Sequence, residues 1–183
     1  MLFLRMKYLY ILLGLGLLLT GGCGFDPLYA PSSFENHPMN SVQNDLSKIR
    51  INLIADRRGQ LLRNHLISLI TPLGQPKKPL YIMDVTITES SQALGILKDA
   101  TFSKSQMTYS AQFKLTDAST GKVLLSTSTE VIADYNIIKN SEFATVISEQ
   151  SAQDRSLVQL AQQISRELAT FFYKISSSQD STL

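Results

Sequence analysis

The sequence predicts an α+β fold: a two-layer sandwich of order β-α-β-β-β-α, with two helices packed on one face of a four-stranded sheet. Four segments have apolar residues at alternate positions, which is typical of half-buried strands. Two further segments have apolar residues three and four positions apart, which is typical of helices with one buried face. Because each strand has one apolar and one polar face, the sheet should be covered on one side only.

The first strand and helix are predicted from residues 48–72. Residues 48–54 alternate, with Ile49, Ile51 and Leu53 on the face expected to be buried. Asp56 is expected to cap the following helix by accepting backbone N–H bonds. That helix ends at Thr71-Pro72, and its apolar positions are Leu62, Leu66, Leu69 and Ile70.

Three more strands and a long helix complete the predicted domain. The strands lie near residues 81–88, 107–116 and 123–135, and Asp117 to Gly121 supply the turn that joins the last two. The helix over residues 142–174 carries a sustained apolar stripe: Leu157, Leu160, Ala161, Ile164, Leu168, Phe171 and Phe172. Its opposite face has few Lys or Arg residues, so packing on the sheet is favoured over lying on a membrane surface.

Residues 1–22 read as a lipoprotein signal peptide. Arg5 and Lys7 precede an apolar run at residues 8–19, whose 12 residues span only ~18 Å as a helix against ~30 Å of hydrocarbon. An uncleaved, tilted membrane anchor is the alternative. Small residues then precede Cys23 as in bacterial lipoprotein signals, although Thr20 stands where Leu is usual. This resemblance implies that Cys23 is acylated and becomes the lipid anchor. Gly24 in the following position favours the outer membrane.

The remaining chain is divided by composition. Residues 23–46 carry three prolines and no sustained period, so they are expected to form an extended tether after the lipidated cysteine. Residues 47–175 form the predicted sandwich domain. Residues 176–183 are expected to be a disordered tail.

Charge and residue usage exclude several function classes. The net charge is +2, and loss of Arg5 and Lys7 with the signal peptide leaves 15 basic (17 minus 2) against 15 acidic residues. No basic stripe exists for nucleic acid. One cysteine excludes an internal disulfide, and two histidines, His37 and His65, are too few for most metal sites, so neither metal nor cofactor is expected. The composition indicates a non-enzymatic domain.

Several short motifs occur in an order that resembles one family. They are Cys23-Gly24-Phe25 with Pro27-Leu28-Tyr29, Arg58-Gly59-Gln60 with Arg63-Asn64, Pro79-Leu80-Tyr81, Leu94-Gly95-Ile96, Asp117 with Thr120-Gly121, Tyr135-Asn136 and Phe171-Phe172. Together they resemble the lipopolysaccharide-assembly lipoprotein family (LptE), from which Asp26 departs. The resemblance implies a lipid-anchored protein on the periplasmic side of the outer membrane. Family members plug the lumen of the LptD β-barrel one to one, assist its folding and help deliver lipopolysaccharide to the outer leaflet.

The connection between the second and third strands, residues 92–104, holds the candidate site. A solvated loop does not need its apolar residues, so we expect a barrel interface formed by Leu94, Ile96, Leu97 and Phe102. Lys98 and Lys104 flank the apolar tip and are expected to pair with lipid A phosphates. The alternative is a tip that folds back onto the core.

Other polar residues have plainer interpretations. The polar sheet face is either solvated or meets the polar lumen of a barrel: Lys48, Arg50, Thr86, Thr108, Ser110 and Lys114. Arg58, Gln60, Arg63 and Asn64 form a polar cluster on the first helix, beside which His65 is expected to be partly buried.

Two other function classes stay open. Ser119 and Lys122 have the spacing of some serine acyl-enzymes but fall in a turn, where the lysine is hydrated, and a lipoprotein hydrolase would lack a suitably placed histidine. A periplasm-facing lipoprotein that binds a small ligand or peptidoglycan is the main alternative.

Overall fold

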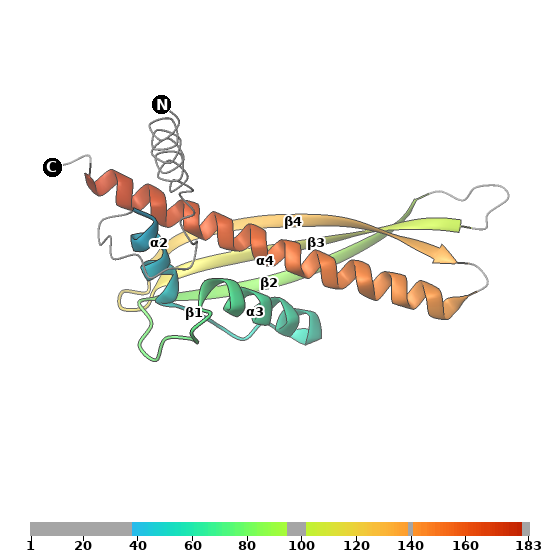
Figure 1. Cartoon of the computed structure of the whole chain (residues 1–183), viewed down its shortest axis with the longest axis horizontal. Helices are drawn as coiled ribbons and strands as arrows, with labels where there is room; N and C mark the ends of the chain where they lie inside the picture. Colours follow the sequence, from blue (N-terminus) through green and yellow to red (C-terminus); the bar gives the residue numbers. More distant parts are fainter. Residues whose placement is uncertain (1–37, 95–101, 139–140, 181–183) are drawn as a thin grey trace, which may run out of the picture. The chain divides into compact units, whose positions relative to one another are not determined.

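The computed structural model describes residues 38–94, 102–138 and 141–180, which lie in one compact unit of residues 36–183. The elements follow in the order α2 (Pro38–Ser47), β1 (Ile49–Ile51), α3 (Asp56–Ile70), β2 (Tyr81–Leu94), β3 (Phe102–Asp117), β4 (Val123–Ile138) and α4 (Glu142–Asp180) (Figure 1). The sheet order is β1-β2-β3-β4, with β1 parallel to β2 and both other pairs antiparallel. The predicted α+β sandwich is confirmed, with α2 as an additional helix.

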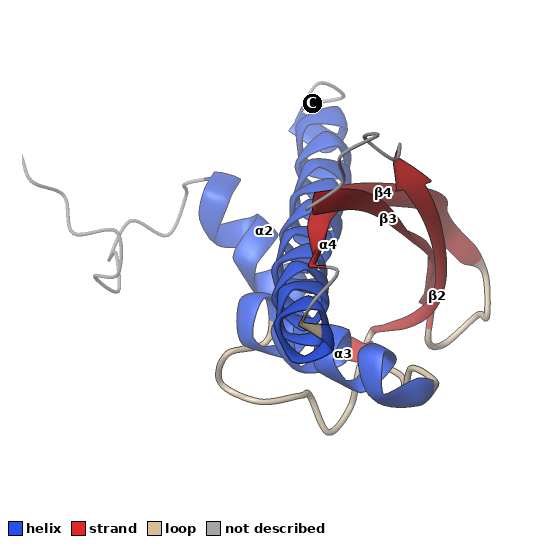
Figure 2. Ribbon diagram, turned by 90° about the vertical axis from the view of Figure 1, so that its right-hand side faces the viewer, coloured by secondary structure: helices blue, strands red, loops and turns tan. Residues whose placement is uncertain are grey.

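The core lies between the sheet and the helices. Figure 2 shows β2, β3 and β4 curving around the side on which α3 and α4 lie. Most of the alternate residues predicted to point inward are buried in β2 and β3, including Met83, Tyr109 and Phe113, whereas Tyr81 and Ile87 are partly buried. They meet the buried helical residues Leu62, Leu66, Ile70, Leu157, Leu160, Ile164 and Leu168.

The three long strands continue past the core at one end. β2 and β3 stay in register from Tyr81 opposite Asp117 to Leu94 opposite Lys104, and β3 pairs with β4 up to Ile138. We call the region of residues 88–94, 102–108, 132–138 and the first turns of α4 the distal end. The proximal end carries the turn at residues 117–122 and the loop at residues 71–80. In Figure 1, α3 stops short of the distal end, whereas α4 reaches it.

The predicted boundary between the first strand and helix is wrong in detail. β1 ends at Ile51, Leu53 is 83% exposed, and Ile54 is buried in its place. Ile54 packs against α3 at Gly59, where an added Cβ would lie 2.6 Å from the Ile54 Cγ2. The alternation therefore breaks because the chain leaves the sheet to reach the helix.

Two helical details also differ from the prediction. Asp56 does not cap α3: the N-cap position is Ala55, which makes no side-chain cap bond, and Asp56 has a φ of 67°. Leu69 belongs to the predicted apolar stripe but is 42% exposed, while its neighbours Leu66 and Ile70 are buried. The buried stripe of α3 is thus narrower than the sequence indicates.

Both segments outside the predicted domain contain helix. The expected extended tether is wrong over its last residues, because α2 spans Pro38–Ser47 and buries Leu46 in the core. The expected disordered tail is wrong up to Asp180, where α4 ends. Ser176 donates its hydroxyl to the Tyr173 carbonyl three residues earlier, a local bond that a serine-rich helix can make. No helix in these described stretches is long and apolar enough to cross a membrane.

Candidate interaction surface at the distal end

The structure places two of the predicted site residues side by side. Leu94 ends β2 and is 39% exposed, and the exposed Lys104 is its cross-strand partner on β3. Directly paired residues point to the same face of a sheet. Because both positions are even-numbered while the buried positions of these strands are odd-numbered, this pair lies on the outer face. An apolar and a cationic side chain are thus exposed next to each other, and their roles at a barrel interface and in lipopolysaccharide binding stay predictions.

The other predicted site residues are less fully described. Phe102 begins β3 opposite Ile138, and its side chain lies outside the described part of the structure. Ile96, Leu97 and Lys98 fall outside the described residues altogether, as does Cys23. Their roles at the barrel interface, in lipopolysaccharide binding and in lipid anchoring stay predictions.

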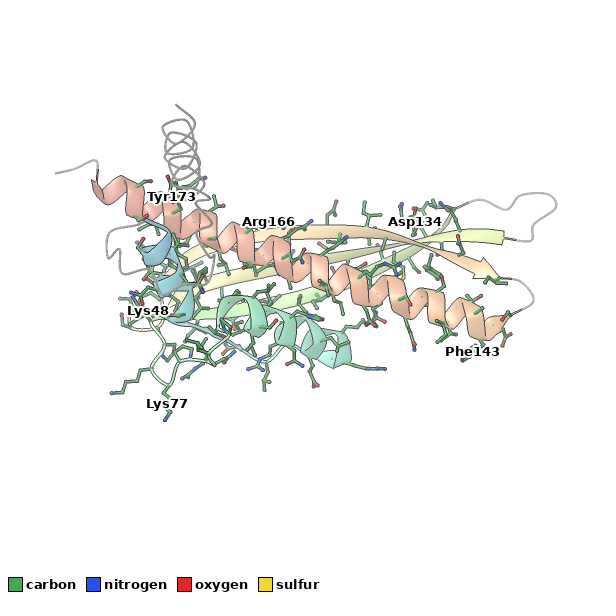
Figure 3. All side chains as sticks on the ribbon, in the orientation of Figure 1. Lys48, Lys77, Asp134, Phe143, Arg166 and Tyr173 are labelled. Atoms are coloured by element: carbon green, nitrogen blue, oxygen red, sulfur yellow. The ribbon has the colours of Figure 1, made fainter. Side chains whose placement is uncertain are left out.

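Sequence reasoning missed an exposed apolar group on α4. Phe143 is 77% exposed, and Val146 and Ile147, three and four residues later on the same side of the helix, are also exposed. Phe143 is labelled at this end of α4 in Figure 3. Counting back from Leu157 in helical turns leads to Val146 and Phe143, so periodicity alone assigns them to the core. The 15 residues of α3 cover only ~22 Å, whereas the 14 residues of β2 extend over ~46 Å. Because of that difference, α4 is the only helix among the described elements that reaches the distal end.

Apolar side chains are therefore exposed on both layers of the distal end. Leu94 and Ile132, which is 55% exposed, lie on the outer face of the sheet, and Phe143, Val146 and Ile147 lie on the helix. We call these five residues together with Lys104 the distal surface. A partner docked on one side would contact a single layer, whereas a partner that surrounds the distal end would contact both.

Hydrogen bonds hold this surface in place. The Ile138 backbone N–H donates to the Thr145 Oγ1 at 2.9 Å, which fixes the start of α4 to the end of β4. Ser105 is buried and donates to the Gln92 carbonyl at 3.3 Å, and the Gln106 amide donates to Asp134 at 3.3 Å. The exposed apolar residues are thus positioned before any partner arrives.

The polar cluster of α3 has structural partners. Arg58 forms an ion pair with Glu89 of β2. The Arg63 Nε donates to the Asn52 carbonyl at 3.1 Å and to the Ile51 carbonyl at 3.3 Å, so it holds the end of β1. These arginines join α3 to the sheet, which is a sufficient reason for their presence.

A hollow lies beside this cluster, between the start of α3, β2, β3 and α4. Its volume is about 430 Å³, and it is lined by Leu61, Met107, Tyr109, Gln150, Gln153 and charged residues that include Arg57, Glu149 and Asp154. Tyr109 is fully buried, and its hydroxyl has no hydrogen-bond partner in the described structure. Burial raises the pKa of Tyr109, partly opposed by the charge of Arg58, so the phenol stays protonated near neutral pH.

The candidate catalytic groups are not arranged for catalysis. The Ser119 hydroxyl donates to the Asp117 carboxylate at 2.6 Å within the β3–β4 turn, and Lys122 is exposed there. Hydrogen bonds from Ser119 and Thr120 lower the pKa of Asp117 to about 2, so this carboxylate shapes the turn and is a poor base. Among the residues with described placement, no three His, Cys, Asp or Glu side chains converge as metal ligands.

The structure is thus an α+β domain whose distal end exposes apolar side chains on both layers. The model of the LptE family, described as lipopolysaccharide-assembly, matches residues 46–170, which is more than half of the chain. The chain therefore belongs to the LptE family. It is accordingly a lipopolysaccharide-assembly lipoprotein of the outer membrane, from a non-enzymatic family, and the resemblance noted in the sequence is confirmed.

Solved structures share the fold. A protein described as a lipoprotein from Caulobacter crescentus CB15 is 24% identical with a TM-score of 0.55, over 71% of this chain and 93% of that one. A minor lipoprotein from Acinetobacter baumannii is 19% identical with a TM-score of 0.53, over 67% and 91% of the two chains. Rare lipoprotein B from Shewanella oneidensis is 10% identical with a TM-score of 0.55, over 70% and 98%. Among curated proteins, no sequence matches this chain.

Proposed function

We propose that this protein is anchored to the outer membrane by acyl chains on Cys23 and plugs the lumen of an LptD-like β-barrel in a one-to-one complex. It assists the assembly of that barrel and the delivery of lipopolysaccharide to the outer leaflet. The observation that carries the proposal is the exposure of apolar residues on both layers of the distal end. A barrel that encloses this end covers both layers at once.

The polar outer face of the sheet supports the same arrangement. Thr86, Lys114 and Glu130 are exposed on this face, and the lumen of an outer-membrane barrel is itself polar. Contacts along the strands would then be hydrogen bonds and charge pairs, while the distal surface supplies apolar contacts. Of the other predicted interface residues, Phe102 begins β3 at this same end, and Ile96 and Leu97 lie outside the described residues.

Lipopolysaccharide contact is assigned to lysines at the distal end. Lys104 is exposed and forms no ion pair with any described carboxylate, whereas Lys114 lies 3.9 Å from Asp84. Lys104 is therefore available to a phosphate of lipid A, and Lys98 is proposed as the second cation. A Lys104→Glu change should weaken binding of purified lipopolysaccharide, and unchanged binding would remove Lys104 from the site.

Crosslinking in native outer membranes tests the plug. A photoreactive amino acid is placed at Phe143 or Leu94, complexes are purified in mild detergent, and crosslinked partners and stoichiometry are determined. We expect one large β-barrel at one to one from both positions. Leu73, an equally apolar and exposed residue at the proximal end, is the matched control. Recovery of the lipoprotein alone, from either distal position, would contradict the proposal.

One observation favours a second candidate, a periplasm-facing module for a small ligand. The 430 Å³ hollow is large enough for a small polar molecule, and Tyr109, whose buried hydroxyl has no described hydrogen-bond partner, is among its lining residues. If the protein is such a ligand-binding module, it should be recovered without a barrel in the purification above, and Tyr109→Phe should impair its function. Recovery of the barrel complex with normal function of Tyr109→Phe would dismiss it.

A further inference from the structure

The proximal end carries a loop with an apolar tip. The Gly74 backbone N–H donates to the Thr71 carbonyl at 2.9 Å, which closes a tight turn with Pro72 in its second position. Gly74 has a φ of 104°, a conformation that residues with a Cβ rarely adopt. Leu73 lies between these two restricted residues and is fully exposed. The turn thus holds a large apolar side chain in solvent.

Side chains from β1 and α3 brace this loop. The Arg50 Nη2 donates to the carbonyls of Lys77 at 2.8 Å and Pro76 at 3.1 Å. Gln75 donates to the Ile51 carbonyl at 3.4 Å and accepts from Arg63 at 3.5 Å. The exposure of Leu73 is therefore a property of a supported loop, and little conformational entropy is lost when the tip meets a surface.

The loop is cationic beside its tip. Lys77 and Lys78 are exposed, and residues 71–80 contain no acidic residue. Lys77 projects away from the domain in Figure 3. Backbone bonds from Leu80 to Lys48 and from Ala118 to Leu80 tie the loop to the rest of the proximal end. An apolar tip beside paired lysines is complementary to an anionic lipid surface, whose headgroups carry phosphate above an apolar interior.

The length of chain before α2 brings that surface within reach. Cys23 precedes Pro38 by 15 residues (38 minus 23), which extend at most ~50 Å. In Figure 1, α2 lies at the same end of the domain as the loop and the β3–β4 turn. A phospholipid leaflet that holds an acyl chain on Cys23 is therefore within reach of the proximal end, where the tether joins the domain.

We infer that residues 71–80 contact the anionic phospholipid leaflet in which the lipid anchor sits. Leu73 enters the headgroup region, and Lys77 and Lys78 pair with phosphates. The two exposed leucines of this loop, Leu73 and Leu80, offer too little area for a protein interface, which covers about 800 Å² per partner. They suffice for a membrane contact that supplements an acyl anchor. The inference rests on the anchor at Cys23, which is part of the proposed function.

A fluorescent label at the tip tests this contact in the full-length lipoprotein. Leu73→Cys is labelled with the environment-sensitive NBD group and reconstituted into vesicles of phosphatidylethanolamine and phosphatidylglycerol. Emission should shift to the blue relative to Ser128→Cys, a matched label on the exposed outer face of β4. Adding Lys77→Gln and Lys78→Gln to the Leu73→Cys chain should weaken the contact about fivefold per lysine. Replacing phosphatidylglycerol with phosphatidylcholine should have a similar effect.

Two outcomes would overturn the inference. One is equal emission from the labels at positions 73 and 128 in anionic vesicles. The other is a blue shift at position 73 that needs an added protein partner, because the loop would then be a protein contact.

Labelling of the parent protein, without Leu73→Cys, tests the proposed lipid anchor separately, because Cys23 is the only natural cysteine. A parent protein that takes no label has no reactive thiol, as an acylated Cys23 requires. A labelled parent counts against the proposed anchor, and the comparison of positions 73 and 128 is then repeated with Cys23→Ser to judge the loop by itself.

Discussion

Replacing Gly59 with alanine should destabilise the protein, although alanine is the better helix former. Gly59 is buried in α3, and a Cβ there would lie 2.6 Å from the Ile54 Cγ2 and 3.0 Å from the Ile54 backbone carbon. Real Cβ atoms do not approach other atoms this closely, and one of the two atoms belongs to the backbone, so Ile54 must move. The contact is what joins the end of β1 to the helix.

The expected size follows from two opposing terms. Removing a glycine from a helix interior contributes about 1 kcal/mol of stability, whereas overpacking a core costs about 1–3 kcal/mol. With a backbone atom in the way we expect the upper cost. Gly59→Ala should then lose roughly 2 kcal/mol, or about 4–8 °C in Tm for a chain of this size.

Urea unfolding followed by circular dichroism measures this difference. Ser68→Ala on the exposed side of the same helix is the control, and it should leave stability unchanged or slightly raised. The double variant Ile54→Ala/Gly59→Ala should lose less stability than the sum of the losses of the two single variants, because the clashing Ile54 Cγ2 is then absent. Equal or greater stability of Gly59→Ala, or strict additivity with Ile54→Ala, would refute the reasoning.

Three further predictions concern single side chains. Thr145→Val should lower the free energy of unfolding by about 1–2 kcal/mol, because the Thr145 hydroxyl accepts a hydrogen bond from the Ile138 amide. Backbone amides at the distal end should then exchange hydrogen faster, and unchanged exchange rates there would contradict this prediction. Tyr109→Phe should keep or gain up to about 1 kcal/mol, since its buried hydroxyl has no partner; a clear loss in thermal unfolding would reveal a bound water or ligand. The pKa of Asp117 is lowered from 3.8 to about 2 on folding, so its stabilisation is present above pH ~4 and disappears as the pH falls toward 2. NMR titration of its carboxyl, with Asp117→Asn as control, should show this, and a midpoint near 3.8 would refute it.

The faces of the strands could be predicted because alternation states directly which residues point inward. Met107, Tyr109 and Phe113 are buried as the period of two requires, and Leu157 to Leu168 follow the helical period. Strand length was harder to predict. β2 was expected to end near residue 88, but it continues through Glu89, Ser90, Ser91 and Gln92 to Leu94. These residues are exposed, so the segment has no buried face to set an apolar period.

The missed part of the distal surface has the same origin. Phe143 and Val146 are in phase with the buried stripe of α4, and only the relative lengths of α3 and the strands show that they are uncovered. Local pattern likewise could not place Ile54, because its burial depends on the missing Cβ of Gly59. In the first case, burial depends on the lengths of elements that are distant in sequence. In the second, it depends on how the chain turns from β1 into α3.

The length of the strands has a consequence for how many partners the domain can engage at once. At ~46 Å, β2 is nearly twice the ~25 Å height of the apolar band of an outer-membrane barrel. One end can therefore lie deep inside such a barrel while the other still projects beyond its periplasmic rim. A barrel could then enclose the distal surface while the loop at residues 71–80 stays outside the barrel and free to contact the phospholipid leaflet of the outer membrane. A loop that binds lipid, as inferred above, would then limit how far the domain enters the barrel.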